Sequence, residues 1–536
     1  MLSISSANHS MSPPIVDIPR RYNAAYDLIE RNLQAGRGDK VAFIDDHGEY
    51  TYSDLDRRSS RVANALKRLG LVQEQRILLC VHDTIDFPAV FLGAIKAGIV
   101  PVAVNTLLTP KDYEYMLKDS RAKIAVVSAP LLAAFEALLD SVPTLDQILV
   151  AGASADNTNA LEAVIANESE HCEIADTIAD EPCFWLYSSG STGAPKGTVH
   201  IHSSMILTAE LYARPTLDIS ENDVVFSAAK LFFAYGLGNG LSFPMAVGAT
   251  TILMAERPTP AAVCERLTRY QPTIFYGVPT LYAALLSSEE LPQSGQVNLR
   301  LCTSAGEALP AELSKRWKQH FDVEIFDGIG STEMLHIFLS NSPDTIRYGT
   351  TGKPVPGYEV RLVDDEGQLV TEAHVTGELQ IRGPTAANGY WNNRQKSRNT
   401  FLGEWTRSGD KYSIDDAGYY VYAGRSDDML KVSGIYVSPI EVEATLMTHE
   451  AVLEAAVIGK EDHDQLTKPA AYIILKPGYE ASDEMASSLK EHVKNALAPY
   501  KYPRWIRFVD ELPKTATGKI QRFKLRELEQ STTADR

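Results

Sequence analysis

The sequence lacks the long apolar runs of a membrane protein, because nowhere do about eighteen apolar residues follow one another, as a spanning helix requires. It also lacks an excess of positive charge: 51 Lys and Arg stand against 69 Asp and Glu, which gives a formal net charge of −18. Binding along a nucleic-acid backbone requires clustered positive charge. We therefore expect neither a membrane nor a nucleic acid as a partner, and any anionic substrate must be met by local cations.

Cysteine is scarce and dispersed along the chain. The five cysteines include no Cys-x-x-Cys pair; they are Cys80, Cys172, Cys183, Cys264 and Cys302. Their spacing suggests neither a zinc site nor a disulfide framework. Free thiols of this kind suit a reducing compartment, so we expect a cytoplasmic protein.

Residues 1–15 are rich in Ser, Asn and Pro and contain no apolar segment of the kind that a signal peptide carries. Such a composition offers little apolar surface to bury. We predict a disordered tail over 1–15, and Met11 remains an alternative start of the chain.

Apolar periodicity predicts an α/β fold. The length of 536 residues exceeds what one hydrophobic core supports, so two or more domains are expected. The predicted elements are helices at 22–33, 52–69, 87–96, 110–118 and 131–139, a hairpin at 41–51, and strands at 76–81, 99–104, 124–127 and 148–151. This alternation predicts sheets with helices on both faces, which bind ligands beyond the carboxyl ends of their strands.

The segment 187–197, Tyr-Ser-Ser-Gly-Ser-Thr-Gly-Ala-Pro-Lys-Gly, follows a short apolar run and is predicted to be a mobile loop leaving a strand. Its glycines let backbone N–H groups approach an anion, its hydroxyls add donors, and Lys196 adds a point charge. A nucleoside triphosphate is therefore the expected guest. The segment is not a Walker A loop, since Pro195 precedes Lys196 and Gly197 follows it. A flexible Gly/Ser linker is the alternative interpretation.

Similar turns follow later strands. Strands predicted at 222–226, 274–276, 299–303 and 323–326 lead into turns, two of which read Ser304-Ala-Gly-Glu-Ala-Leu309 and Asp327-Gly-Ile-Gly-Ser-Thr-Glu333. A β-rich stretch at 357–383 precedes Trp405-Thr-Arg-Ser-Gly-Asp410. After Gly424 the pattern changes to strands at 456–458, 470–475 and 506–509 with a helix at 485–497, which predicts a small α+β unit.

These motifs, in this order, resemble those of the adenylate-forming enzymes, the superfamily of acyl- and aryl-CoA synthetases, peptide-synthetase adenylation domains and luciferases. The resemblance covers nearly the whole chain. It implies a large N-terminal domain over 16–424, with αβαβα-type sheets and a β-barrel-like part that hold the ATP and aryl-acid sites. It also implies a small, mobile α+β C-terminal lid domain over 425–536, with the hinge near Asp427.

The resemblance further implies which residues bind ATP and Mg²⁺. The residues that match the ATP site are Ser188, Ser189, Gly190, Ser191, Thr192, Gly193, Lys196, Gly306, Glu307, Ala308, Asp327, Gly328, Ile329, Gly330, Asp410 and Arg425. Thr332 matches a catalytic residue at the α-phosphate, and Glu333 a catalytic residue that orients Mg²⁺. The chemistry fits, since a hard cation on triphosphate prefers oxygen ligands. Tyr-Gly often stands in the family where Ile329-Gly330 stands here, so no aromatic ring is predicted to stack on adenine.

The acid-binding residues are expected in two segments that resemble the benzoate-CoA ligase branch. In Lys230-Leu-Phe-Phe-Ala-Tyr-Gly-Leu-Gly-Asn-Gly240, the family match implies that Ala234 and Tyr235 line the pocket. In Met334-Leu-His-Ile-Phe-Leu-Ser-Asn341, it implies the same for His336 and Ile337, and Lys431 is a further candidate near the carboxylate. A core segment and a hydrogen-bonded core histidine are the alternatives.

The C-terminal motifs imply the catalytic lysine and the coenzyme A path. Leu512-Pro-Lys-Thr-Ala-Thr-Gly-Lys-Ile-Gln-Arg522 matches the motif that carries the superfamily's catalytic Lys519. Within Gly424 to Glu443 the match implies that the loop around Gly434 lines the CoA tunnel. A solvated surface charge is the usual reading of a lone lysine. The Lys519 segment also resembles sites modified by a lysine acetyltransferase and deacetylase, and a homodimer is left open.

The resemblance implies an AMP-forming aryl-acid CoA ligase that converts benzoate, ATP and CoA to benzoyl-CoA, AMP and diphosphate through benzoyl-adenylate. Related substrates are the alternatives: an aminobenzoate, a halobenzoate, cinnamate or a medium-chain acid. A free-standing adenylation domain that loads a carrier protein, and a luciferase-type oxygenase, would share the motifs. A non-catalytic aryl-acid sensor is disfavoured by Lys519, Glu333 and Asp410.

Overall fold

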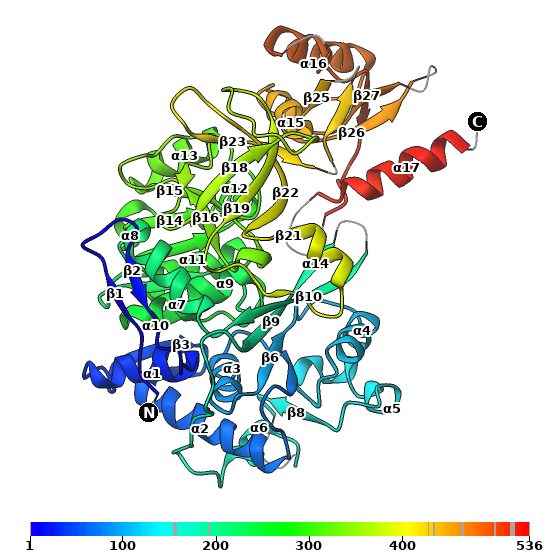
Figure 1. Ribbon diagram of the computed structural model, residues 1–536. Helices are drawn as coiled ribbons and strands as arrows, with labels where there is room; N and C mark the ends of the chain where they lie inside the picture. The colour runs from blue at the N-terminus through cyan, green and yellow to red at the C-terminus, as the bar shows by residue number, and fades with distance from the viewer. Residues whose placement is uncertain are drawn as a thin grey trace. The chain divides into compact units, whose positions relative to one another are not determined.

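The computed structural model describes residues 2–153, 158–190, 193–426, 428–432, 435–462, 466–497, 500–514 and 520–534 (Figure 1). The chain divides into two compact units, Met1–Val360 with Ile381–Arg407, and Arg361–Gln380 with Ser408–Arg536. This division differs from the predicted domain boundary at 424/425. Strand β22 (Trp405–Ile414) pairs with β23 (Tyr420–Arg425), and most of this hairpin belongs to the same unit as the residues that follow it. Among the described residues, no helix has the length and apolar character to cross a membrane.

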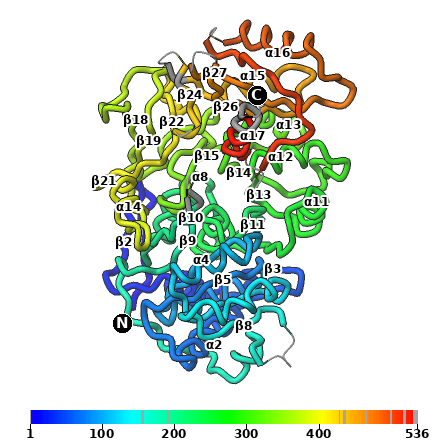
Figure 2. The backbone as a smooth tube through the Cα atoms, turned by 90° about the vertical axis from the view of Figure 1, so that its right-hand side faces the viewer, coloured from blue at the N-terminus to red at the C-terminus, as the bar shows by residue number. Residues whose placement is uncertain are grey.

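The first unit contains a seven-stranded sheet of order β20-β10-β9-β6-β5-β7-β8. Figure 2 labels β10, β9, β5 and β8 of this sheet from top to bottom. Its strands are β5 (Arg76–Cys80), β6 (Val100–Ala103), β7 (Ile124–Ser128), β8 (Gln147–Ala151), β9 (Pro182–Gly190), β10 (Gly193–Ile201) and β20 (Gly389–Tyr390). The strands from β9 to β8 run parallel, whereas β10 and β20 are antiparallel to their neighbours. All residues of β6 and β7 are buried, as expected for central parallel strands covered on both faces.

Three of the six helices described in this half begin at a side-chain cap. They are α1 (Ala24–Gln34), α2 (Tyr52–Arg68), α3 (Asp86–Lys96), α4 (Pro110–Ser120), α5 (Leu138–Ser141) and α6 (Leu161–Ile165). Capping boxes formed by Thr51 with Asp54 and by Thr109 with Asp112 satisfy the first N–H groups of α2 and α4. The helix predicted at 131–139 is wrong: a 3₁₀ helix (Ala129–Ala134) and the short α5 stand there, separated where Phe135 stacks on Tyr113 with ring centroids 4.5 Å apart.

A nine-stranded sheet of order β17-β16-β15-β14-β13-β11-β12-β3-β4 forms the other half of the first unit. Its strands are β3 (Val41–Asp45), β4 (Gly48–Thr51), β11 (Val224–Ser227), β12 (Thr250–Ile252), β13 (Ile274–Gly277), β14 (Leu301–Ser304), β15 (Ile325–Gly330), β16 (Ile337–Ser340) and β17 (Lys353–Pro354). The strands from β15 to β3 are parallel. The turns that carry most candidate residues therefore leave one edge of the sheet, at its carboxyl ends.

The remaining helices of the first unit lie mostly between the parallel strands of this sheet, whereas the first two precede β11 and the last follows β20. They are α7 (Ser204–Thr208), α8 (Arg214–Leu217), α9 (Ala234–Leu237), α10 (Phe243–Val247), α11 (Pro260–Arg269), α12 (Pro279–Leu286), α13 (Ala311–Phe321) and α14 (Arg394–Thr400). Two π-helical turns interrupt them, η2 (Ala209–Ala213) between α7 and α8, and η3 (Gly238–Ser242) between α9 and α10. Such turns are rare and occur frequently at functional sites.

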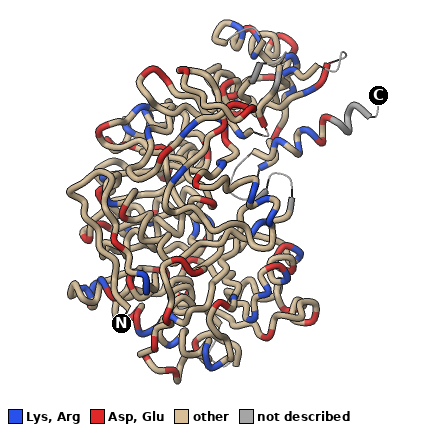
Figure 3. Tube along the Cα trace, in the orientation of Figure 1, with Lys and Arg blue, Asp and Glu red and all other residues tan. Residues whose placement is uncertain are grey.

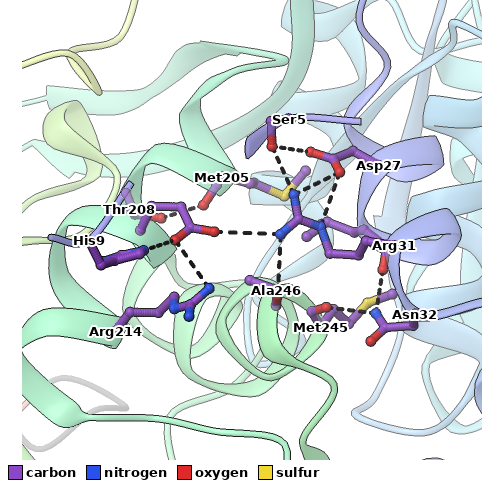
Figure 4. A network of polar contacts seen from close by, with 12 residues as sticks. Ser5, His9, Asp27, Arg31, Asn32, Met205, Thr208, Arg214, Met245 and Ala246 are labelled. Carbon is purple, nitrogen blue, oxygen red and sulfur yellow. Dashed lines mark hydrogen bonds and ion pairs between the residues drawn. The ribbon is translucent and has the colours of Figure 1, made fainter. Parts of the chain in front are cut away.

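The disordered tail predicted for residues 1–15 is wrong for the described residues 2–15. Ser6–Asn8 and Ile15–Asp17 pair as strands β1 and β2. Ser5 Oγ donates to Asp27 Oδ2 at 2.6 Å, and His9 Nε2 lies 2.6 Å from Glu210 Oε2 (Figure 4). Arg31 joins these contacts, since its guanidinium binds Asp27 at 2.8 Å and Glu210 at 3.5 Å. Polar side chains of this segment thus bind buried charged groups, and the segment is ordered.

The second unit has the predicted α+β composition. Its strands are β24 (Leu430–Val432), β25 (Ile435–Val437), β26 (Val452–Glu461), β27 (Thr467–Leu475) and β28 (Trp505–Phe508), with helices α15 (Pro439–Met447), α16 (Asp483–Ala496) and α17 (Arg522–Ala534). The helices α15 and α17 were not predicted. The β-rich stretch forms a five-stranded sheet in which β18 (Glu359–Val363), β19 (Gly377–Arg382), β22 and β21 (Phe401–Leu402) follow one another and β23 pairs with β22.

Charged residues of both signs are scattered along the described chain (Figure 3). The net charge of −18 is therefore distributed over many elements.

Candidate active site

The segment 187–197 belongs to the hairpin of β9 and β10, and the predicted mobile loop is in this respect wrong. Lys196 stands opposite Ser188, and Gly193 opposite Gly190, so only Ser191 and Thr192 lie outside the strands and outside the described residues. We call residues 188–196 the phosphate hairpin. The buried Ser188 Oγ has no hydrogen-bond partner among the described residues, as a donor reserved for a ligand would have.

Contacts from α4 and from β20 hold this hairpin in place. The Tyr187 hydroxyl donates to Asp119 Oδ2 at 2.7 Å, and the Tyr115 hydroxyl donates to the Pro195 carbonyl at 3.1 Å. Trp391 N–H donates to the Gly197 carbonyl at 2.8 Å. Burial, more than any other cause, raises the pKa of the Tyr187 hydroxyl and that of the Asp119 carboxyl. The hairpin is therefore anchored at both strands, close to the residues that would meet phosphate.

The turns after β14 and β15 lie next to each other. The parallel register places Ser304 opposite Asp327, so the turn containing Gly306, Glu307 and Ala308 leaves the sheet beside the turn 327–333. Gly306 has φ +93°, a conformation that other residues rarely adopt. Burial raises the pKa of the Asp327 carboxyl well above its usual value, and Asp327 Oδ1 lacks a hydrogen-bond partner in the described part of the chain.

Glycine is required where the turn after β15 meets His336. A Cβ at Gly330 would lie 2.5 Å from the His336 carbonyl oxygen, and a Cβ at Gly328 would lie 3.2 Å from Ile337 Cγ2. Thr332 begins the short 3₁₀ helix η5 (Thr332–Met334), and its carbonyl lies 2.7 Å from His200 Nε2. The backbone of the catalytic candidates is thus fixed from both sides.

Glu333, the candidate Mg²⁺ ligand, is held by a residue that sequence reasoning missed. The Tyr390 hydroxyl donates to Glu333 Oε1 at 2.7 Å, and Ala387 N–H donates to the Glu333 carbonyl at 2.8 Å. The Tyr390 ring also faces Lys196, whose Nζ lies 4.6 Å from the ring centroid. Among the described residues, no cluster of three or more His, Cys, Asp or Glu side chains could cage a metal. A single carboxylate beside a phosphate cradle instead fits Mg²⁺ held mainly by substrate oxygens.

The acid-pocket candidates converge around His336. Its Nε2 lies 3.2 Å from the Tyr235 carbonyl oxygen, and its ring packs 5.5 Å from Tyr235, 5.6 Å from Tyr212 and 4.4 Å from Phe243. Burial lowers the pKa of His336 to about 3, so the imidazole is neutral. His336 is therefore part of an aromatic wall and carries no charge to offer a carboxylate.

Tyr235 forms the more accessible part of this wall. Its hydroxyl lies 2.5 Å from Thr303 Oγ1, and its half-buried neighbour Ala234 begins α9. The hydroxyl of the fully buried Tyr276, whose ring lies 6.4 Å from Tyr235, has no partner within the described residues. Ile337 is buried in β16. Tyr212 and Phe243 had no motif to reveal them, since only the π-helical turns bring them to His336.

The remaining candidates belong to the second unit. Asp410 pairs with Arg425 across β22 and β23, and Arg425 Nη1 lies 3.2 Å from Asp410 Oδ1. Asp410 is thus buried and already ion-paired. Lys431 is placed by its backbone alone, in β24. Asp427, Gly434 and Lys519 lie outside the described residues, although Lys514 and Ile520 form a bridge at the two ends of the segment 515–519.

Comparison with known proteins agrees with this arrangement. The model of the AMP-binding enzyme family matches residues 29–391. The chain belongs to the AMP-binding enzyme family. The C-terminal domain of AMP-binding enzymes matches residues 441–519. The predicted relation to adenylate-forming enzymes is confirmed.

Several AMP-binding enzymes match along nearly their full length. The chain is 66% identical to benzoate-CoA ligase of Thauera aromatica, covering 98% of this chain and 100% of the relative. It is 50% identical to 4-hydroxybenzoate-CoA/benzoate-CoA ligase of Rhodopseudomonas palustris, covering 95% and 94%.

Solved structures of AMP-binding enzymes match as well. A benzoate CoA ligase from Burkholderia xenovorans has TM-score 0.87 at 55% identity, covering 94% of this chain and 99% of the other. An anthranilate CoA ligase in complex with anthranoyl-AMP has TM-score 0.91 at 45% identity, covering 96% and 99%. The predicted α/β class, with a large N-terminal and a small C-terminal domain, is confirmed.

Proposed function

We propose that this chain is an AMP-forming benzoate-CoA ligase, which joins benzoate to coenzyme A at the expense of ATP. The observation that supports this most directly is the 66% identity to the Thauera aromatica enzyme over 98% of the chain. The neutral aromatic wall of Tyr235 and His336 adds a physical reason, since a flat apolar ring is best received by aromatic side chains. Its position in the same unit as the phosphate hairpin allows one site to hold both substrates.

In the first half-reaction the carboxylate attacks the α-phosphorus of ATP, releases diphosphate and forms benzoyl-adenylate. Two anions have to approach, so positive charge must lie between them. Lys196 on the hairpin and Lys519 on the C-terminal motif supply it. Thr332 meets the α-phosphate, and Asp410 accepts hydrogen bonds from the ribose. Glu333 would hold Mg²⁺, which neutralises phosphate charge when bound.

In the second half-reaction the thiol of coenzyme A displaces AMP. A lysine on the phosphates would obstruct this step, so we infer that the C-terminal domain turns about Asp427, withdraws Lys519 and brings the Gly434 loop to the pantetheine path. Acetylation of Lys519 would stop the first half alone, because it removes the charge. A cytoplasmic location and a homodimer remain proposals of the same kind.

An AMP-release assay with a panel of acids tests the proposal. Benzoate and fluorobenzoates should give the highest kcat/KM, aminobenzoates and cinnamate lower values, and hexanoate the lowest. An aromatic wall receives a flat ring better than an alkyl chain, and an amino group on the ring would have to be desolvated there. A preference for hexanoate over benzoate would contradict the aryl-acid assignment. Replacing CoA by a carrier-protein thiol separates a CoA ligase from a carrier-loading adenylation domain.

A further inference from the structure

Strand β20 adds a short edge to the phosphate hairpin and carries Tyr390 to it. Thr198 pairs with Tyr390 and Val199 with Gly389, both antiparallel. Ser397 Oγ accepts a hydrogen bond from the Tyr390 N–H at 2.9 Å, and Tyr390 is only 7% exposed. The register and this bond therefore fix the backbone of Tyr390, from which the side chain extends.

From this position Tyr390 contacts two candidate residues that come from different elements. Its hydroxyl donates to Glu333 Oε1 at 2.7 Å, and its ring face receives the Lys196 ammonium at 4.6 Å. Lys196 stands on β10 and Glu333 on the turn after β15, in two different sheets of the first unit. Tyr390 is a side chain through which both can be oriented at once.

We propose that Tyr390 is a positioning residue that aligns the carboxylate of Glu333 with the ammonium of Lys196. This inference rests on the proposed function, because it takes Glu333 as the residue toward Mg²⁺ and Lys196 as the residue toward phosphate. A hydrogen bond to an ionised acceptor is stronger than one between neutral groups, so the hydroxyl fixes one carboxylate oxygen and leaves the orientation of the other defined. The ring attracts the ammonium through its quadrupole and keeps it on the hairpin side.

The two contacts use different parts of the side chain, so two substitutions separate them. Tyr390→Phe removes the hydroxyl and keeps the ring, whereas Tyr390→Leu removes both. The ring also packs 5.5 Å from Phe401, so a packing loss is expected in Tyr390→Leu. Tyr348→Phe is the matched control, because the Tyr348 hydroxyl donates to Glu324 Oε2 at the same distance of 2.7 Å. Glu324 precedes β15 and therefore lies at the opposite end of this strand from Glu333.

Binding measurements on the whole chain test the proposal without turnover. ATP affinity is measured by calorimetry in EDTA, and the affinity of Mn²⁺ for the enzyme with a non-hydrolysable ATP analogue is measured by electron paramagnetic resonance. Tyr390→Phe should weaken Mn²⁺ binding about tenfold and leave metal-free ATP binding within about twofold of the parent. Tyr390→Leu should weaken Mn²⁺ binding as much as Tyr390→Phe does. It should also weaken metal-free ATP binding, to an affinity about threefold lower than that of Tyr390→Phe. Tyr348→Phe should change neither.

The proposal is overturned if Tyr390→Phe binds Mn²⁺ as the parent does, or if it weakens metal-free ATP binding as much as Tyr390→Leu. A purely structural tyrosine would lower the melting temperature and leave both affinities unchanged, which also overturns it. Failure of the proposed function is a distinct result: the parent protein would then release no AMP with any aromatic acid, while the binding comparison between the variants could still be read.

Discussion

His336 contacts both the backbone and the ring of Tyr235: His336 Nε2 lies 3.2 Å from the Tyr235 carbonyl oxygen, and the centroids of the two rings are 5.5 Å apart. Because α9 and the turn after β15 are far apart in the sequence, this contact ties the two segments of the candidate acid pocket to each other. It also makes the pocket sensitive to changes behind its wall.

Gly238 lies behind that wall and sets its position. A Cβ there would come within 2.3 Å of His336 Cδ2, so Gly238→Ala should push the imidazole toward the acid and raise the KM for benzoate about tenfold. The KM for ATP should stay within about twofold. Gly240→Ala, in the same π-helical turn but facing Leu231 Cδ2 at 2.9 Å, is the control. Equal effects of the two variants on benzoate would show that His336 does not transmit the change.

The buried histidines predict loss of stability in acid. Burial lowers the pKa of His336 to about 3 and that of His200 to about 4. Since these values lie below the unfolded value of about 6.5, the unfolded state takes up more protons and stability falls as the pH drops from about 6.5 toward 3. His336→Asn should lose less stability over this window, by about 2 kcal/mol at pH 5. Chemical unfolding at pH 7.5 and pH 5 measures the free energy of unfolding of both proteins. If His336→Asn lost as much stability between these pH values as the parent does, the prediction would be contradicted.

Glu210 is the buried carboxylate on which the N-terminal hairpin depends. Its side chain is 3% exposed, and it meets His9, Arg31 and Arg214. Glu210→Gln should lower the free energy of unfolding by about 3 kcal/mol, because buried positive charge is left unbalanced. Asp180→Asn, at a pair with Arg20 that is more than half exposed on both sides, should change it by less than about 1 kcal/mol. Similar losses in both variants would refute the role of burial.

Substitutions of the catalytic lysine and of the hinge residue should affect different half-reactions. Lys519→Ala should abolish diphosphate exchange and spare thioester formation from supplied benzoyl-adenylate. Asp427→Pro should impair mainly the second half, because proline restricts the backbone on which the rotation depends. Diphosphate-exchange and adenylate-consumption assays measure the two steps. Equal loss of both halves in Lys519→Ala would contradict domain alternation.

Local patterns predicted what depends on neighbours in the sequence. Strands such as β5 and β7 and helices such as α2 follow from apolar periodicity and caps. Motifs located the phosphate-binding segment and the turn at Glu333, although the hairpin form of the former was not predicted. The family and fold class predicted from them are confirmed. The roles assigned to individual residues, Lys519 and Glu333 among them, stay predictions.

Contacts between distant segments could not be read in the same way. His9 and Glu210 are 201 positions apart, and Tyr390 and Glu333 are 57 apart. No periodicity marks such partners, because register and π-helical turns alone bring them together. The polar N-terminal segment was therefore predicted as disordered, and Tyr390 and Tyr212 were missed.

The hairpin of β1 and β2 supplies partners to two buried acids of the first unit. A polypeptide begun at Met11 would be made without Ser5, His9 and the strand Ser6–Asn8. Asp27 and Glu210 would each lose one hydrogen-bond partner. Removal of residues 1–10 would thus leave both carboxylates with fewer partners in the interior, so that proteolytic trimming of this segment would weaken the fold.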